Sequence, residues 1–401
     1  MVAISMRGIN MPSSPIRKLS TFADAAKSDG VKLYHLNIGQ PDIETPSVLM
    51  EKVKRSNIKV LEYTESAGFL SLRKKMALFY LSKGINVSYE DILITIGGSE
   101  AILFAFMACL DIGDEIIVPE PFYANYIGFA ISAGIKIIPI TSNIESEFSL
   151  PSIKSFKEKI TDKTKGIFIC NPNNPTGYLY SERELIEIRD LIKERDLYLF
   201  SDEAYAEFCY EKDIKSTLTL NGVDNHVIMI DTFSKKYSAC GARIGALVTK
   251  NRDIIKTVMK FSQARLSPPT LEQIAAEAAL SLPEKYFKKI REEYKLRRDV
   301  LIGRLTQMDG VYCKCPQGAF YVMAKLPVSD TDFFCKWLLT DFRNGNSTLM
   351  LAPGSGFYFT PGLGKNEVRL AYVLNTDEIN LAMDCLEKAL IKFNEIFKSN
   401  D

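Results

Sequence analysis

The sequence is short of histidine and of net charge, and it lacks long apolar runs. Its 401 residues include only two histidines, His35 and His226, which argues against a Ser-His-Asp or Cys-His hydrolase. Fifty basic residues stand against forty-nine acidic ones, a formal net charge of +1. This balance provides no global field that would attract nucleic acid or an acidic membrane surface. We therefore expect the partners to be small molecules or a second copy of the chain.

The cysteines show no metal-binding spacing. Eight of them are scattered along the chain without a CxxC pair. Because so few histidines are available to complete a ligand set, we expect reduced thiols and no zinc or other metal site.

No segment has the pattern of a leader or of a membrane span. The residues from Met1 to Gly8 lack an apolar run of signal-peptide length, and no later stretch is long enough to cross a bilayer. A cytoplasmic location is the expectation that follows. With 46% hydrophobic and 25% charged residues, the chain can bury a large core, and its length favours two domains.

Short apolar runs alternate with helical patterns between about residues 92 and 249. Continuous apolar runs of this kind are typical of strands that are buried on both faces of a mostly parallel sheet. The segment 183–195 supports intervening helices, because its leucines and isoleucines fall on one helical face and charges fill the other. The runs expected to form strands are 92–96, 115–118, 135–138, 166–170, 197–200, 227–230 and 246–249.

The pattern changes toward the C-terminus. Residues 284–307 are rich in charge and carry apolar residues at helical spacing, which predicts a long helix that leaves the large domain. Beyond it, a strand-like piece (319–322) is followed by helical ones (332–342 and 376–393), an α+β pattern.

The polar first residues predict an arm rather than a domain. We therefore divide the chain into an N-terminal arm (1–45), a large domain (46–290) and a small C-terminal domain (291–401).

The most informative chemistry lies in residues 231–245. They read DTFSKKYSACGARIG and place Lys235 just after an apolar run, with Arg243 eight positions further on. A surface lysine has a pKa of about 10.4 and is a poor nucleophile at neutral pH, whereas a lysine that is desolvated beside a cofactor or a second cation becomes reactive toward carbonyls. Lys235 is therefore expected to hold an aldehyde cofactor. Arg243, Thr232 and Ser234 are expected to hold a phosphate of that cofactor.

Further motifs lie on both sides of this lysine segment. They read NPNNPTG at 171–177, DEAY at 202–205 and VRL at 368–370. With the lysine segment, they make the chain resemble the class I/II, fold-type I aminotransferases, which use pyridoxal 5′-phosphate (PLP), and it is most similar to the aspartate aminotransferases among them. Any one short motif is weak, but their order across residues 36–373 makes the resemblance specific. It implies a large PLP-binding domain (46–290) with a mostly parallel seven-stranded sheet between helices, and a smaller α+β domain (291–401) that the N-terminal arm (1–45) joins.

The resemblance also implies a role for each residue around the cofactor ring. Asp202 keeps the pyridine nitrogen protonated, so that the ring can accept electrons. Tyr205 and Asn174 hydrogen-bond the phenolic oxygen, and Tyr123 stacks on the ring face. Without the family, DEAY fits a helix N-cap after a strand better, and Tyr123 fits a core aromatic equally well.

The phosphate site is expected at a helix start. Gly98 and Ser99 lie where the run 92–96 turns into an apolar helix expected over 101–110, and such a turn offers backbone N–H groups to an anion. Arg243 adds a fixed charge that binds an anion through two nitrogens. Alone this turn is weak evidence, because many strand-to-helix turns carry glycines and serine.

Other residues are assigned by the resemblance to the substrate or to a neighbouring subunit. Arg369 matches the arginine that clamps the α-carboxylate, assisted by Asn174, and Gly39 matches the arm glycine whose backbone closes over it. Tyr63 matches a tyrosine that reaches the neighbour's phosphate, which implies a homodimer with shared active sites. Arg265 is a candidate to pair with the distal carboxylate of aspartate or glutamate in the partner's site, and an interface or surface ion pair is the alternative.

The implied reaction is amino-group transfer between an amino acid and a 2-oxo acid by a ping-pong route, with Lys235 as the base at the α-carbon. A C–S lyase, a decarboxylase or an aminocyclopropanecarboxylate-synthase-like lyase remains possible on the same scaffold. A PLP-binding regulator would add a DNA-binding region, and a nicotinamide dehydrogenase would need a GxGxxG turn that 97–101 does not match. Aspartate or glutamate is the favoured donor. Alanine or a broad set stays open, because residues 265–269 are also similar to alanine aminotransferases.

Overall fold

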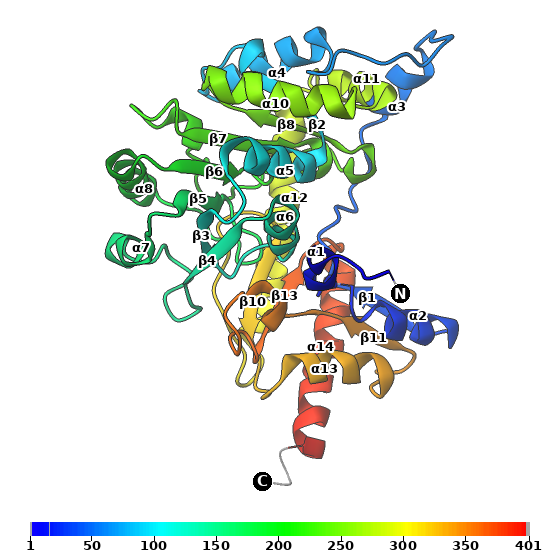
Figure 1. Cartoon of the computed structure of the whole chain (residues 1–401). Helices are drawn as coiled ribbons and strands as arrows, with labels where there is room; N and C mark the ends of the chain where they lie inside the picture. Colours follow the sequence, from blue (N-terminus) through cyan, green and yellow to red (C-terminus); the bar gives the residue numbers. More distant parts are fainter. Residues whose placement is uncertain (1, 16, 398–401) are drawn as a thin grey trace.

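A seven-stranded sheet forms the centre of the computed structural model, which describes residues 2–15 and 17–397 (Figure 1). The spatial order of its strands is β2-β8-β7-β6-β5-β3-β4. Strand β8 runs in the direction opposite to the other strands of this sheet. This mostly parallel sheet confirms the predicted fold class. The strands are β2 (Ile92–Ile96), β3 (Glu115–Glu120), β4 (Lys136–Thr141), β5 (Thr164–Cys170), β6 (Tyr198–Asp202), β7 (Val227–Thr232) and β8 (Ile244–Val248).

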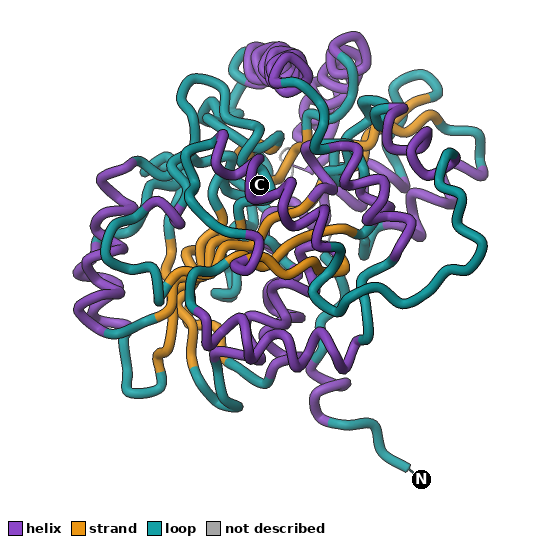
Figure 2. Tube along the Cα trace, turned by 90° about the horizontal axis from the view of Figure 1, so that it is seen from above, coloured by secondary structure: helices purple, strands orange, loops and turns teal. Residues whose placement is uncertain are grey.

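Apolar residues on both sides of the strands explain the helices on both faces of the sheet (Figure 2). In β5, Phe168 packs into a core with α5 and α6, whereas Ile167 and Ile169 pack into a second core with α4, α8 and α11. The helices of this part are α3 (Ser47–Lys54), α4 (Leu70–Ser82), α5 (Gly97–Cys109), α6 (Asn125–Ala133), α7 (Ile153–Lys159), α8 (Glu182–Arg195), α9 (Phe233–Lys236), α10 (Arg252–Arg265) and α11 (Thr270–Ala279).

Local sequence accounts for the sharp ends of α8. Its N-cap, Ser181, forms a capping box with Glu184, and the helix ends at Asp196 in the left-handed conformation. The buried side is the one that the apolar pattern predicted, and it includes Leu185 and Ile188.

The long helix α12 (Glu284–Leu305) leads into a second, smaller sheet, as the pattern of residues 284–307 predicted. This sheet has the strand order β12-β13-β10-β9 and is antiparallel throughout. Its elements and those around it are β9 (Tyr312–Cys313), β10 (Tyr321–Lys325), α13 (Thr331–Thr340), β11 (Ser347–Met350), β12 (Ala352–Pro353), β13 (Glu367–Ala371) and α14 (Thr376–Phe397).

The N-terminal residues join this C-terminal part (Figure 1). They contain α1 (Met6–Asn10), α2 (Ser20–Ser28) and β1 (Lys32–His35). β1 pairs in parallel with β11, so that residues more than three hundred positions apart share one ladder. The boundaries 1–45, 46–290 and 291–401 stay a proposal.

The carboxyl ends of the central parallel strands point to one edge of the sheet, where open α/β sheets bind their ligands. Cys170, Asp202 and Thr232 end β5, β6 and β7 at this edge. None of the helices in the described ranges is long and apolar enough to cross a membrane.

Candidate active site

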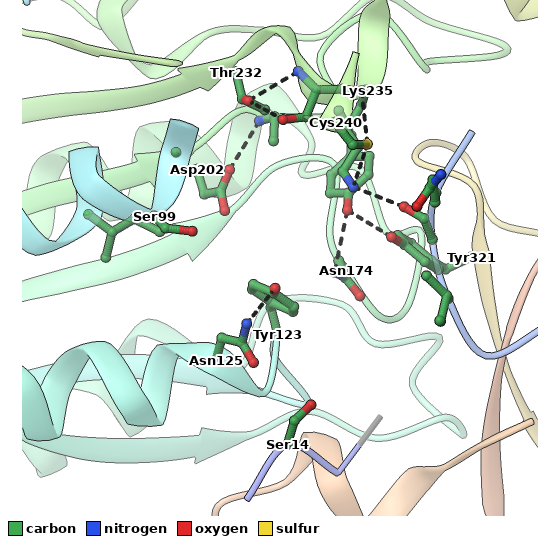
Figure 3. A pocket seen from close by; sticks show the side chains of 18 of the residues that line it. Ser14, Ser99, Tyr123, Asn125, Asn174, Asp202, Thr232, Lys235, Cys240 and Tyr321 are labelled. Atoms are coloured by element: carbon green, nitrogen blue, oxygen red, sulfur yellow. Dashed lines mark hydrogen bonds between the residues drawn. The ribbon is translucent and has the colours of Figure 1, made fainter. Parts of the chain in front are cut away.

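A cavity of about 330 Å³ opens at this edge, between the central sheet, the N-terminal arm and the C-terminal part (Figure 3). Every residue that the sequence assigned to the site lines it, except Tyr63 and Arg265. The assigned residues that line it are Gly39, Gly98, Ser99, Tyr123, Asn174, Asp202, Tyr205, Thr232, Ser234, Lys235, Arg243 and Arg369.

Lys235 lies on α9, a single turn that follows β7 directly. Thr232 caps this turn by accepting a hydrogen bond from the Ser234 N–H at 3.2 Å. The Lys235 ammonium donates to the Gly39 carbonyl oxygen at 2.9 Å. Burial lowers the pKa of Lys235, and the nearby charges of Arg369 and Arg243 lower it further, although Cys240 acts in the opposite direction. More of such a lysine is present as the free amine than of a surface lysine, so that it is more available as a nucleophile and as a proton acceptor.

Asp202 is the buried carboxylate of the cavity. Its Oδ2 accepts a hydrogen bond from the Tyr126 hydroxyl at 2.6 Å, and its Oδ1 accepts one from the Ala204 N–H at 3.1 Å. Burial raises the pKa of Asp202, whereas the bonds from Tyr126 and Ala204 lower it. A cationic ligand atom beside this carboxylate would also favour its ionised form.

Two phenols and an amide lie close together in the lining of the same cavity. The Tyr205 and Tyr321 hydroxyls are 2.8 Å apart, and the Asn174 amide nitrogen donates to Tyr205 at 3.5 Å. All three side chains are buried. The group offers hydrogen bonds to a single oxygen atom of a ligand.

The helix that follows the run 92–96 was predicted to begin at residue 101. This prediction was wrong, because the helix, α5, begins at Gly97. Gly97 takes a positive φ of 71°, and a Cβ there would lie 2.4 Å from Arg243 Nη2. The Glu100 carboxylate accepts a hydrogen bond from the Ile96 N–H at 2.8 Å and so fixes the first turn. Ser99 therefore lies within that turn rather than before it.

These features fit a phosphate. The start of α5 presents backbone N–H groups at Gly98 and Ser99, and the hydroxyls of Thr232 and Ser234 lie across the same cavity. Arg243 comes close enough to Gly97 to exclude a side chain there, which brings a fixed cation to the same turn. Together with a buried carboxylate, a lysine and an aromatic ring, this donor set fits PLP.

Arg369 on β13 is buried, with 1% of its surface exposed. Its Nη1 donates to Asn174 Oδ1 at 2.9 Å, and its guanidinium stacks over the rings of Tyr321 and Phe357, 4.5 and 4.7 Å from their centroids. No carboxylate of the described residues forms an ion pair with it, and its Nε has no hydrogen-bond partner. Because burying an unpaired charge is costly, such an arginine is suited to an anionic ligand.

Tyr63 and Arg265 lie outside the cavity of their own chain. Tyr63 is 79% exposed. Arg265 pairs with Glu100 at 2.7 Å and donates to the Ser66 carbonyl oxygen at 3.0 Å. Both were assigned to a neighbouring subunit's site, and for both that role stays a prediction.

Sequence reasoning missed several lining residues, of which Tyr321 matters most, and it also missed the buried Tyr126, which hydrogen-bonds Asp202 from outside the lining. Tyr126 was hidden in an apolar helix start, and Tyr321 was counted only as part of a strand. The sequence carried no signal for Tyr321, whose place became visible only in the fold, where a Cβ on Gly39 would lie 1.7 Å from its hydroxyl. The other lining residues that were missed are Ser14, Arg17, Ile38, Gln40, Ile102, Asn125, Phe129, Ala204 and Cys240.

Comparison with known proteins gives the site its context. Residues 31–386 match the family model described as aminotransferase class I and II. The aspartate aminotransferase of Pyrococcus horikoshii is 32% identical over 394 residues, which cover 96% of this chain and 97% of that protein. An aromatic-amino-acid aminotransferase of Thermococcus litoralis is 31% identical and covers 97% of this chain and 98% of its own.

Solved structures agree with the fold. The aspartate aminotransferase of Thermotoga maritima superimposes with a TM-score of 0.88 at 30% identity, over 96% of this chain and 100% of that one. An alanine aminotransferase of Pyrococcus furiosus gives 0.88 at 31% identity, over 97% and 100%.

The fold and the site therefore define a fold-type I enzyme that depends on PLP. The chain belongs to the class I and II aminotransferases, which act on amino acids and 2-oxo acids.

Proposed function

We propose that this aminotransferase takes aspartate or glutamate as its amino donor and works by two half-reactions at one site. The observation that carries the amino-acid part is the buried, unpaired Arg369 in the same cavity as Lys235. Relatives that are named aspartate aminotransferases support the acidic donor. The neighbour named alanine aminotransferase keeps alanine, or a broad set, as the second candidate.

The cavity residues divide the binding work. Arg243, Thr232 and Ser234 would hold the phosphate of PLP with the first turn of α5, and Asp202 would pair with its ring nitrogen. When bound, PLP supplies an aldehyde that condenses with amines and a ring that withdraws electrons from the α-carbon.

The proton chemistry falls to Lys235. Its lowered pKa increases the share of the amine that is neutral, and a neutral Nζ can take the α-proton of the donor and later return it. Arg369 would fix the donor by two-point contact with its α-carboxylate, which turns the α-carbon toward the lysine. The Gly39 carbonyl, which accepts from Lys235 at 2.9 Å, orients the amine.

We also propose a homodimer, in which the exposed Tyr63 reaches the partner's phosphate. A cytoplasmic location remains a prediction.

A panel of amino donors tested against 2-oxoglutarate decides the donor. The proposal expects the highest kcat/KM for aspartate or glutamate, and an equal or higher value for alanine would overturn the acidic assignment. Ammonia is measured in parallel, because a C–S lyase would release it and a transaminase would not.

A further inference from the structure

The charges that line the cavity do not balance. Four cationic residues face one carboxylate, since Arg17, Lys235, Arg243 and Arg369 stand against Asp202 alone. A site with this excess of positive charge is suited to a ligand set with several negative charges.

The proposed function accounts for every one of these charges except Arg17. PLP would engage Lys235, Arg243 and Asp202, and the α-carboxylate of the donor would engage Arg369. A neutral amino acid brings no further anion, so that the guanidinium of Arg17 would face it unmatched. A dicarboxylic amino acid brings one.

The backbone of Arg17 is held in a hydrogen-bonded turn. Its N–H donates to the Ser14 carbonyl oxygen at 3.0 Å, and its own carbonyl oxygen accepts from the Ser20 N–H at 2.9 Å. The neighbouring Lys18 is engaged elsewhere, in an ion pair with Asp332. Two adjacent cations of the arm therefore have different surroundings, and Arg17 is the one that borders the cavity.

The Arg17 side chain is free to bind a ligand. Within the described residues, no hydrogen bond or ion pair engages its guanidinium, whereas Arg265, the earlier candidate, already pairs with Glu100 at 2.7 Å. An arginine that is unpaired and partly solvated in the free enzyme gives up no internal partner when it binds a carboxylate.

The charge of Arg17 acts on the Tyr123 hydroxyl inside the cavity. Burial raises the pKa of the Tyr123 hydroxyl, and the charges of Arg369, Arg243 and Arg17 oppose that shift. Three guanidinium groups thus act on one hydroxyl, which is hydrogen-bonded to the Asn125 amide at 2.7 Å (Figure 3). Arg17, Arg243 and Arg369 therefore all line the cavity within electrostatic range of the Tyr123 hydroxyl.

We propose that Arg17 binds the second carboxylate of an acidic amino donor, and of the matching dicarboxylic 2-oxo acid, and so selects these substrates over neutral ones. This inference rests on the proposed function and names the residue of the same chain that reads the substrate side chain. Arg369 and Arg17 would hold the two ends of a dicarboxylate.

The test compares Arg17→Met with the wild-type PLP-loaded enzyme. The variant is expected to lose about 10- to 100-fold in kcat/KM for aspartate and glutamate, the range for one hydrogen-bonded charged contact, while its kcat/KM for alanine stays the same or rises. Binding of succinate, a dicarboxylate without an amino group, is followed through the absorption of bound PLP and should weaken by a similar factor. Arg17→Lys should recover part of the loss.

The adjacent cation provides the matched control. Lys18→Met removes one charge from the same arm segment and is expected to leave aspartate, alanine and succinate unaffected. An equal loss for alanine and aspartate in Arg17→Met would overturn the proposal, and so would unchanged succinate binding. Failure of the wild-type protein to bind PLP or to transaminate any donor would instead overturn the proposed function, so the two failures are distinguishable.

Discussion

At the scale of single residues, Lys235 and Asp202 have opposite requirements within one cavity. Transamination needs a neutral Lys235 amine, and burial helps by lowering its pKa. It also needs an ionised Asp202, and there burial acts against the reaction by raising the pKa. The hydrogen bonds from Tyr126 and Ala204 to Asp202 lower this pKa and so offset part of the effect of burial. They therefore support the reaction, although neither residue is predicted to contact a ligand.

Asp202→Asn is expected to reduce turnover far more than cofactor binding. The amide cannot stabilise a protonated pyridine, whereas the phosphate contacts of Arg243, Thr232 and Ser234 survive. PLP affinity and kcat are measured on the same preparation. A variant with near-normal turnover would contradict the role of Asp202. Tyr126→Phe, which removes only the 2.6 Å hydrogen bond, should give a smaller loss in the same direction.

Arg369→Met is expected to raise KM for every amino donor, because all donors share the α-carboxylate. Truncating one partner of a buried charge pair typically costs about 2–5 kcal/mol, which sets the size of the effect. An effect confined to one donor would show that Arg369 contacts the side chain of the substrate instead.

The same variant tests the electrostatics around the lysine. The charge of Arg369 helps to lower the pKa of Lys235, so its removal should raise that pKa. Covalent attachment of PLP needs the neutral amine, and its pH midpoint should therefore move to higher pH in Arg369→Met. The rate of attachment is followed by absorption across a pH series. Arg17→Met is the matched control and should leave the midpoint in place, and an unchanged midpoint in Arg369→Met would contradict the prediction.

At the scale of elements, the single-turn helix α9 separates two neighbouring lysines. Lys235 faces the cavity, whereas Lys236 is buried and pairs with Asp231 at 2.5 Å. The Tyr80 hydroxyl donates to the same Asp231 oxygen at 2.8 Å. This buried network ties α9 to β7 and α4, and so fixes the turn that carries Lys235.

Lys236→Met is expected to destabilise the fold by about 3–5 kcal/mol, because it leaves the Asp231 carboxylate buried without its cation. Denaturant midpoints measure the effect. The double variant Lys236→Met with Asp231→Asn removes both charges and should recover much of the loss. A single variant as stable as the wild type would show that Lys236 does not hold the turn.

Burial, backbone conformation and strand pairing explain which elements could be predicted from the sequence. The central strands lie within a few residues of their apolar runs, because strands that are buried on both faces need continuous apolar sequence. The start of α5 was missed because it depends on the positive φ of Gly97 and on Glu100, neither of which a hydrophobic pattern reports. The two-residue strands β9 and β12 exist only through their pairing with β10 and β13.

The residues of the candidate site also divide into those that could be predicted from the sequence and those that could not. Lys235 was assigned from its sequence context and Arg369 from the family resemblance, and both line the cavity. Tyr321 and Arg17 are recognisable only once the fold brings them to the cavity, and Tyr126 only once the fold brings it to Asp202. A tyrosine in a helix or strand and an arginine in a polar arm carry no local signal.

At the scale of the whole molecule, three distant stretches of chain close one cavity. Arg17 and Gly39 come from the arm, Lys235 from the central sheet and Arg369 from the C-terminal sheet. Tyr63 is 79% exposed and lies outside this cavity, and the proposed dimer gives it a place in the partner's site.

A hybrid experiment tests this sharing of sites. Lys235→Ala and Tyr63→Phe subunits should each have little activity, and mixing them should restore turnover, because one site of each hybrid contains both wild-type groups. Subunit exchange is verified with differently tagged chains. If exchange occurs and no activity returns, the sites are not shared.

The most direct measurement for the central claim is a single turnover of the PLP-loaded enzyme with glutamate and no acceptor. In a ping-pong aminotransferase, the visible absorption of bound PLP should disappear and about one 2-oxoglutarate should be released per subunit without ammonia. Borohydride reduction before the reaction should attach PLP to Lys235. The Lys235→Ala variant should neither release 2-oxoglutarate nor be labelled at this position. Continuous release of 2-oxo acid with ammonia, or labelling of Lys236 in place of Lys235, would contradict the account.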